Sequence, residues 1–215
     1  MSSIVVLSGG LDSTVSLAYE KSNTKLILFF NYHQLALEKE RSAVKKISKY
    51  YKIPWKEVEI NFMDSFKNVP ENVKIDSKKE TEQSAEVVWV PNRNALFANI
   101  AAYFAALEGA KTVVMGFNKE EAETFPDNSS EFVKRVNDLW QYSLKKKIVL
   151  KSHTIEMMKS QIVKAGQELD VPWKYIWSCY LAHEKMCGKC ESCLRLKRAI
   201  SSTDVKNYFT ERFLE

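Results

Sequence analysis

The residues of greatest chemical interest begin the chain, in the segment VVLSGGLDSTV of residues 5–15. Gly9 and Gly10 can adopt positive φ angles and bring the backbone close to a ligand, because they have no Cβ. A helix that begins after them presents unpaired N–H groups and a positive dipole end, both of which favour an anion. Hydroxyl donors accompany the turn: Ser8, Ser13 and Thr14. The segment therefore predicts a phosphate-binding turn.

The turn differs from the common nucleotide-binding patterns. It has no lysine before its Ser/Thr, as a Walker motif requires, and it lacks the three spaced glycines of a dinucleotide fingerprint. Asp12 is better placed to cap the helix or to meet a metal ion than to touch phosphate. An ordinary glycine turn with an Asp cap is the alternative, but the strand–turn–helix context favours a phosphate site.

A second group of chemically capable residues is the cysteine cluster near the end of the chain. The four cysteines are separated by seven, two and two residues: Cys179, Cys187, Cys190 and Cys193. Four thiolates at such spacing suit a closed, structural zinc site, and the turn with Gly188 can wrap the ion. Iron–sulfur ligation and unligated thiols are the alternatives. His183 is expected to be a surface histidine, because the cysteines already complete a site.

The composition limits the class of protein. A chain of 215 residues with 45% hydrophobic and 27% charged residues predicts one folded domain, alone or with a small appendage. No apolar run reaches the roughly 20 residues of a membrane span, and the start MSSIVVLSGG lacks secretory signal features, so we expect a cytoplasmic protein without membrane contact. The net charge of +5 is spread along the chain, and no direct nucleic-acid binding is expected.

The elements that must position these residues alternate along the chain. Buried strands are predicted at 3–8, 25–30, 55–61, 111–118 and 146–150, and helices from about 12, then at 35–51, 94–110, 129–143 and 155–169. Residues 62–88 are polar without a strong period, which predicts an excursion or mobile loop. The alternation favours an α/β fold, a doubly wound parallel sheet with right-handed crossovers, whose ligand lies beyond the carboxyl ends of the strands.

The motifs together carry a family resemblance. SGGLDST, residues 8–14, resembles the phosphate loop of the ATP pyrophosphatase (PP-loop) superfamily. With WVPNRNALF at 89–97 and the cysteine tail, the chain resembles the 7-cyano-7-deazaguanine synthase family from about Ile4 to Arg198. The resemblance implies an adenine nucleotide alpha hydrolase-like PP-loop domain at 1–172 and a small helical segment at 173–215 that binds zinc through its four cysteines.

The resemblance also implies an activity. In this family ATP activates the carboxylate of 7-carboxy-7-deazaguanine, ammonia gives the amide, and a second adenylation leads to the nitrile, with release of AMP and pyrophosphate. The implied cofactors are ATP, Mg²⁺ and Zn²⁺, and the product enters queuosine or archaeosine biosynthesis. Some family members are dimers, and by this analogy we expect a homodimer. Which of the two pathways the product would enter stays open.

Site residues follow from the same resemblance. The loop expected to hold the departing pyrophosphate comprises Leu7, Ser8, Gly9, Gly10, Leu11, Asp12, Ser13, Thr14 and Val15. Asp12, Arg93 and Lys159 are the candidate catalytic residues, the two cations lying near phosphate or the adenylate. A structural ion pair is the alternative for Arg93, and a solvated helix face is the alternative for Lys159.

The chain departs from the family pattern in two segments that bear on the substrate. The segment GFNKEEAETFPDNSSEF at 116–132 keeps only part of the family pattern, and NYHQLALE at 31–38 lacks the Arg-His pair that commonly follows the Gln. Candidate substrate-binding residues in and near these segments are Tyr32, Gln34, Glu121, Glu123 and Asp127. Each carboxylate could instead be loop charge without a ligand.

Two further functions compete with this interpretation. The first is a PP-loop enzyme that acts on another acceptor, such as a tRNA base or a protein terminus; base thiolation is weakened because no cysteine lies outside the cluster. The second is a zinc-ribbon RNA-binding module attached to an inactive nucleotide fold. The complete SGGLDST segment favours a working ATP site over this second alternative.

Overall fold

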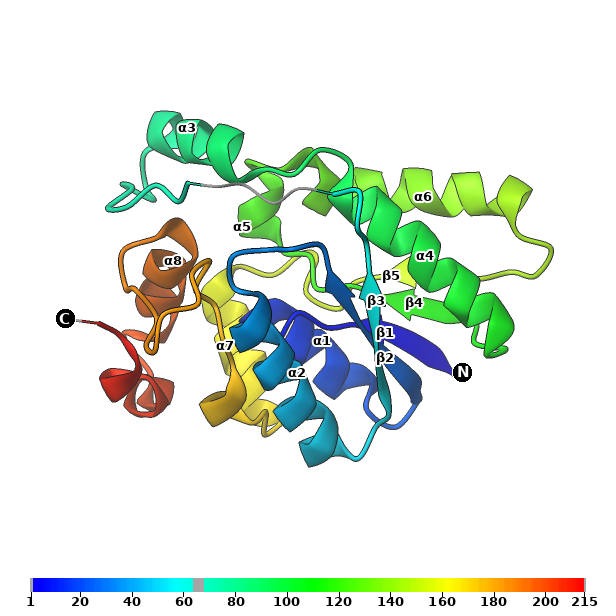
Figure 1. Ribbon diagram of the computed structural model, residues 1–215, viewed down its shortest axis with the longest axis horizontal. Helices are drawn as coiled ribbons and strands as arrows, with labels where there is room; N and C mark the ends of the chain where they lie inside the picture. The colour runs from blue at the N-terminus through cyan, green and yellow to red at the C-terminus, as the bar shows by residue number, and fades with distance from the viewer. Residues whose placement is uncertain (1, 64–67, 215) are drawn as a thin grey trace.

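The protein is described here by a computed structural model that covers residues 2–63 and 68–214. Its centre is a five-stranded sheet in the order β3-β2-β1-β4-β5, parallel throughout (Figure 1). The strands are β1 (Ser3–Val6), β2 (Thr24–Asn31), β3 (Trp55–Glu59), β4 (Thr112–Val114) and β5 (Val149–Lys151). The doubly wound parallel sheet predicted from the alternating pattern is confirmed, and each predicted strand segment overlaps one strand.

Helices cover both faces of the sheet, α1, α2 and α7 on one face and α4 and α6 on the other (Figure 1). The helices are α1 (Leu11–Glu20), α2 (Leu37–Tyr51), α3 (Lys78–Val88), α4 (Arg93–Leu107), α5 (Lys119–Ala122), α6 (Ser130–Ser143), α7 (Lys159–Glu168) and α8 (Glu191–Ile200). Short 3-10 turns lie at Pro126–Asn128, Trp173–Tyr175, Asp204–Tyr208 and Thr210–Arg212.

The core follows from the two-residue period of the central strands. Ile4 and Leu28 face one side of the sheet and pack with α4 and α6, whereas their neighbours Val5 and Phe29 face the other side and pack with α1 and α2. Because both faces are covered, the strands read as continuous apolar runs rather than as alternating ones. This is why β1 and β2 could be predicted from sequence.

Two predicted segments differ from the structure. Within 62–88, residues 64–67 lie outside the described residues, but Lys78–Val88 forms a helix whose N-cap is Ser77. Its buried positions are helically spaced but hold mostly small or polar side chains, Thr81, Ser84, Ala85 and Val88, so the pattern gave no apolar period. The helix predicted at 155–169 begins only at Lys159, because Met158 is extended and its N–H binds Gln161 Oε1 at 2.8 Å.

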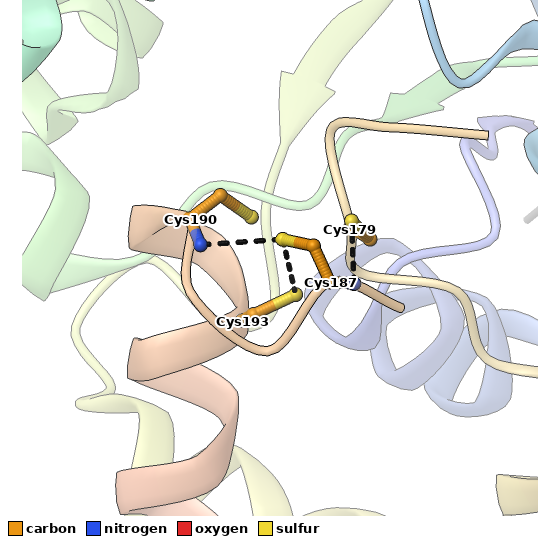
Figure 2. A group of neighbouring side chains, drawn as sticks. All are labelled: Cys179, Cys187, Cys190 and Cys193. Carbon is orange, nitrogen blue, oxygen red and sulfur yellow. Dashed lines mark hydrogen bonds between the residues drawn. The ribbon is translucent and has the colours of Figure 1, made fainter. Parts of the chain in front are cut away.

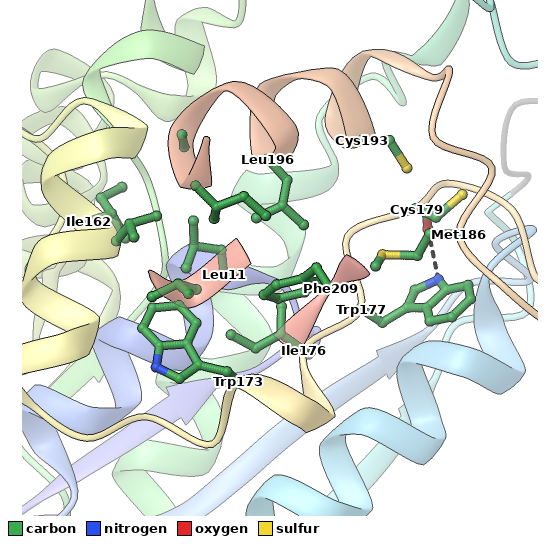
Figure 3. Close-up of a cluster of buried hydrophobic side chains, with 14 of the residues drawn as sticks. Leu11, Ile162, Trp173, Ile176, Trp177, Cys179, Met186, Cys193, Leu196 and Phe209 are labelled. Carbon is green, nitrogen blue, oxygen red and sulfur yellow. Dashed lines mark hydrogen bonds between the residues drawn. The ribbon is translucent and has the colours of Figure 1, made fainter. Parts of the chain in front are cut away.

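The C-terminal segment packs directly on the sheet helices. Figure 3 shows Trp173, Ile176, Leu196 and Phe209 in one buried cluster with Leu11 of α1, and Ile162 of α7 belongs to the same cluster. Its apolar surface is therefore buried against the helix that begins at the predicted phosphate turn. In the part of the chain that the structure covers, no helix is long and apolar enough to cross a membrane.

Candidate active site and metal centre

A cavity of about 250 Å³ opens at the carboxyl ends of β1, β2 and β4. Its lining includes most of the predicted phosphate turn, the residues that follow β2 and β4, the start of α4, Lys159, and residues 177–180 of the C-terminal segment. Strand order places β2 and β4 on either side of β1, so the chain crosses to opposite faces of the sheet at this point. This is where ligands bind in doubly wound sheets, as the sequence predicted.

The glycine turn has the conformation that its sequence requires. Gly9 has a φ of +84°, and a Cβ at this position would lie 2.6 Å from Ala43 Cβ on α2. Gly10 is the N-cap of α1, without a side-chain cap, so Asp12 lies in the first turn and does not cap the helix. Thr14 Oγ1 donates to the Gly10 carbonyl at 2.7 Å. Because the Gly10 N-cap has no side chain to bind them, the first N–H groups of α1 suit an anion.

The predicted nine-residue loop divides into two groups. Six of its residues line the cavity: Leu7, Ser8, Gly10, Leu11, Asp12 and Ser13. Gly9 faces α2, and Thr14 and Val15 are buried beneath the turn, where they support it. Gly116, which follows β4, also touches the turn, since a Cβ there would lie 2.5 Å from the Ser13 nitrogen.

Lys159 is buried between two carboxylates at the edge of the cavity. Its Nζ lies 2.5 Å from Asp12 Oδ2 and 2.7 Å from Glu121 Oε1. The side chain of Lys159 is 9% exposed, so the solvated helix face considered for it is wrong. Asp12 Oδ1 is buried and has no hydrogen-bond partner within the described residues. The cluster therefore combines one cation, two acids and one unused carboxylate oxygen.

The protonation of this cluster reflects burial and mutual charge. Burial raises the pKa of Asp12 to about 6, although Lys159 opposes the shift and Glu121 adds to it. Burial also disfavours the Glu121 carboxylate, but the charge and hydrogen bond of Lys159, with Arg195, lower its pKa. Burial alone would lower the pKa of Lys159, yet the two carboxylates raise it. Lys159 is therefore a permanent cation at neutral pH.

Arg93 begins α4 and points toward the residue that follows β2. Its Nη1 donates to the Tyr32 hydroxyl at 3.1 Å, and its guanidinium carbon lies 5.6 Å from the centroid of that ring. Among residues 2–63 and 68–214, no carboxylate is within ion-pair distance of Arg93, so the structural ion pair considered for it is not present there. The guanidinium is thus free to meet an anion in the cavity.

Glu40 is a cavity residue that sequence reasoning missed. Gln34 Nε2 donates to Glu40 Oε2 at 2.8 Å and to the Phe30 carbonyl at 3.0 Å. Burial raises the pKa of Glu40 to about 7, against the opposing effects of Gln34 and Arg93. A detectable signal existed, because Glu40 shares the helical spacing of the buried Ala43, Val44 and Ile47 of α2. A carboxylate in line with buried apolar residues indicates a buried acid that must be hydrogen-bonded or protonated.

The other predicted substrate residues are placed unequally. Tyr32, Gln34 and Glu121 line the cavity. Glu123 is exposed, and neither it nor the half-buried Asp127 is among the lining residues; the Asp127 carbonyl accepts a hydrogen bond from Asn94 Nδ2 at 3.4 Å. Burial raises the pKa of Asp127, with Arg93 opposing. Phe125 and Asn128 line the cavity from this segment instead.

The four cysteines form one compact cluster (Figure 2). Their sulfur atoms all lie within 4.8 Å of one another, and Cys187 Sγ and Cys193 Sγ are 3.9 Å apart. A tetrahedral ion with metal–sulfur bonds of about 2.3 Å separates its ligands by about 3.8 Å. The donor set therefore fits a single metal ion, whereas thiolates that bind different irons of a cluster must lie farther apart.

Backbone N–H groups surround the cysteine sulfurs. Cys179 Sγ accepts from the Leu181 and Cys187 nitrogens, and Cys187 Sγ accepts from the Cys190 nitrogen, each at 3.3 Å. Such bonds stabilise thiolate charge. His183 is exposed and is not part of the cluster, as expected.

The cysteine segment is joined to the phosphate turn. The Trp177 nitrogen donates to the Gly9 carbonyl at 2.9 Å, two residues before the first cysteine. Trp177, Ser178, Cys179 and Tyr180 line the cavity. The segment that leads into the cysteine cluster and the predicted phosphate turn thus border the same cavity.

Comparison with known proteins agrees with this geometry. The model of the family "Queuosine biosynthesis protein QueC" matches residues 2–204. The 7-cyano-7-deazaguanine synthases of Carboxydothermus hydrogenoformans and Methanosarcina mazei are 47% and 36% identical, over 91% and 99% of this chain and 96% and 99% of those proteins. A phosphoadenylyl-sulfate (PAPS) reductase structure from Candida auris covers 80% of this chain and 74% of its own, at 16% identity and a TM-score of 0.39, too distant to support an argument. The family model covers nearly the whole chain and the relatives are 36–47% identical over most of its length, so the chain belongs to the QueC family.

Proposed function

We propose that this chain is an ATP-dependent 7-cyano-7-deazaguanine synthase, which converts 7-carboxy-7-deazaguanine and ammonia to the nitrile and releases AMP and pyrophosphate. The observation that carries the proposal is the contact of Lys159 with Asp12 in the first turn of α1. It places a buried cation beside the helix N-terminus where a pyrophosphate group would lie. The relatives named above support the choice of the deazaguanine acid.

In this reaction the site must position the acid against ATP and neutralise the charge of the leaving pyrophosphate. The carboxylate oxygen of the acid attacks the α-phosphorus of ATP, and the bond to pyrophosphate breaks. Ammonia then displaces AMP to give the amide, whose oxygen is adenylated in the same way before loss of AMP gives the nitrile. In both adenylations the turn and Lys159 hold the negative charge that develops on the leaving pyrophosphate.

Mg²⁺ fits the acidic side of the same cluster. Asp12 Oδ1 is a buried carboxylate oxygen without a protein partner among the described residues, and oxygen atoms are the ligands that Mg²⁺ prefers. When bound, the ion neutralises phosphate oxygens. Asp12 would hold it, and Lys159 keeps the other oxygen of Asp12 fixed.

The acceptor substrate would occupy the opposite side of the cavity. Arg93 offers the acid or its adenylate a guanidinium that has no ion pair within residues 2–63 and 68–214, and Tyr32 orients that guanidinium through its hydroxyl. Attack by ammonia releases protons, and Glu40, with a pKa of about 7, is suited to accept one near neutral pH. Glu40 is therefore our candidate general base for the amide-forming step.

We propose that the four-cysteine centre binds one Zn²⁺ in a structural role. All four ligands come from protein thiolates, which leaves no open position for water or substrate. Metal analysis by mass spectrometry should find about one zinc per chain. A stoichiometric amount of iron and sulfide would contradict the assignment.

Assembly and location stay predictions. A homodimer is expected from the family resemblance, and light scattering on the purified protein measures it. The cytoplasmic location expected from sequence is tested by fractionation of the source cells.

One experiment tests the function. The zinc-loaded protein is incubated with ATP, Mg²⁺, ammonium and 7-carboxy-7-deazaguanine, and mass spectrometry follows the nitrile, the amide and AMP. Without the deazaguanine acid, AMP should not form. Formation of ADP and phosphate, or of AMP only when tRNA replaces the acid, would contradict the proposal.

A further inference from the structure

A buried arginine connects the cysteine segment with the cluster of Lys159, Asp12 and Glu121. The side chain of Arg195, on α8, is 5% exposed and lies between two acids. Its Nη1 donates to Glu120 Oε1 at 2.7 Å, and its Nε and Nη2 donate to Glu191 Oε1 at 2.9 and 2.8 Å. Buried ion pairs of this kind contribute little net stability, because desolvation offsets their attraction. Their presence therefore calls for another role.

Glu120 passes this contact on toward Lys159. Its Oε2 accepts a hydrogen bond from the Lys159 backbone nitrogen at 3.4 Å, and its Oε1 also meets Arg198. Glu120 is followed by Glu121, whose carboxylate binds Lys159 Nζ at 2.7 Å. Arg195 thus holds Glu120, which is next to Glu121, the residue that binds the Lys159 amino group. Through Glu120 it also holds the N-terminal end of α7, the helix that carries Lys159.

Helix α5, which carries both acids, cannot hold this geometry alone. It has four residues, Lys119–Ala122, too few for a helix that is stable by itself. Asn118 caps it at 2.9 Å, and the Lys119 nitrogen donates to the Met157 carbonyl at 3.1 Å. Its two acids supply the further anchors, Glu121 through Lys159 of α7 and Glu120 through Arg195 and Arg198 of α8.

We propose that Arg195 is a positioning residue through which α8 sets the place of the Lys159 amino group against Asp12. The N-terminal end of α8 carries Cys190 and Cys193, so the metal centre fixes the helix from which Arg195 reaches Glu120. Arg195 does not line the 250 Å³ cavity, so it reaches the Lys159 amino group through its hydrogen bond to Glu120 and through the effect of its charge on Glu121. The proposal rests on the proposed role of Lys159, and it connects the structural metal with catalysis.

The principal test is the variant Arg195→Met with its zinc content confirmed. In its crystal structure, the distance from Lys159 Nζ to Glu121 Oε1 should exceed hydrogen-bond range. The kcat for nitrile formation should fall about 10- to 100-fold, as expected for a displaced catalytic group. The Kd for ATP should change by a smaller factor, because the backbone of the phosphate turn is untouched. Arg195→Lys, which keeps the charge but not the fork of donors, should recover part of kcat.

Two further variants separate positioning from loss of stability. Leu196→Ala removes the neighbouring, fully buried apolar side chain of α8 and destabilises the same helix without touching Glu120. It should keep the Lys159 contacts and lower kcat less than Arg195→Met. If Arg195→Met does not fold, Glu120→Gln weakens the same link with little change in volume and should give the same split between kcat and Kd.

The outcomes distinguish this inference from the proposed function. Unchanged Lys159 contacts and an unchanged kcat in folded Arg195→Met would overturn the positioning role. Equal losses in Leu196→Ala would overturn it too, because a general loosening of α8 would then explain the effect. If the unmodified protein makes no nitrile, the proposed function fails, and the crystal structure of Arg195→Met still decides whether Arg195 positions Lys159.

Discussion

Replacement of Glu40 by Gln gives a prediction whose size follows from the structure. The pKa of Glu40 is about 7 in the fold, against an ordinary value of 4.5. This difference corresponds to roughly 3.4 kcal/mol of stability that is present below pH 4.5 and lost as the pH rises through 7, because the buried carboxylate must then ionise. Between pH 5 and pH 8 the loss is about 2.5 kcal/mol, and partial exposure of the side chain makes this an upper value.

Glu40→Gln keeps the shape of the side chain and its contact partner but cannot ionise. The variant should therefore lose about 2.5 kcal/mol less than the unmodified protein between pH 5 and pH 8, or roughly 5–10 °C in Tm. Thermal unfolding followed by circular dichroism at both pH values measures the difference. The same variant should form less amide, since the proposed proton acceptor is gone.

The control is Glu108→Gln, which changes an exposed acid that forms no ion pair in the described part of the chain. Its unfolding should depend on pH as in the unmodified protein. If unfolding of Glu40→Gln depended on pH in the same way as unfolding of Glu108→Gln, the pKa of Glu40 would not be raised in the fold. The proposed role of Glu40 as proton acceptor would then be wrong.

Three further predictions concern the phosphate side and the metal centre. Lys159→Met should lower single-turnover pyrophosphate release about 10²- to 10³-fold, the usual effect of removing a charge-stabilising group, whereas Lys164→Met, on the exposed side of α7, should not. Gly116→Ala should weaken ATP binding in calorimetry, because its Cβ would lie 2.5 Å from the Ser13 nitrogen. The control Gly109→Ala should leave ATP binding unchanged, since a Cβ there meets nothing within 4 Å, although its φ of +64° should cost about 1–2 kcal/mol of stability. Removal of the proposed zinc ion by a chelator should lower Tm before it alters turnover per folded molecule, because the four cysteines belong to the buried apolar cluster of α1, α7 and α8.

Each of these results has an opposite that would count against the structure. Equal pyrophosphate release by Lys159→Met and Lys164→Met would remove Lys159 from the reaction. Equal ATP affinity in the two glycine variants would mean that close packing of Gly116 against the turn at Ser13 does not affect ATP binding. Complete loss of turnover in chelated protein of unchanged Tm would contradict a metal that acts only through the position of α8.

The parts of the site that sequence predicted are those whose signal is local. The turn at Gly9 and Gly10 could be predicted because glycine, hydroxyl and helix-start signals stand within a few residues. The cysteine cluster was equally clear, since three of its ligands lie within seven residues. Strands buried on both faces showed themselves as unbroken apolar runs.

The parts that sequence did not reveal depend on contacts between distant segments. Lys159 and Asp12 are separated by 147 positions, and nothing near either residue shows that they form an ion pair. Glu121 and Glu123 stand two positions apart in an acidic segment, yet only Glu121 turns into the cavity. Helix α3 escaped detection because its inner face is made of Thr, Ser and Ala rather than large apolar residues.

The hydrogen bond from the Trp177 nitrogen to the Gly9 carbonyl means that the N-terminal motif is completed by the far end of the chain. A fragment that stops after residue 172 would keep the whole SGGLDST segment but lose the hydrogen bond from Trp177 to the turn at Gly9. Grafting the glycine segment onto another scaffold would fail for the same reason. The smallest part of this chain that we expect to bind a triphosphate therefore includes the loop that leads into Cys179.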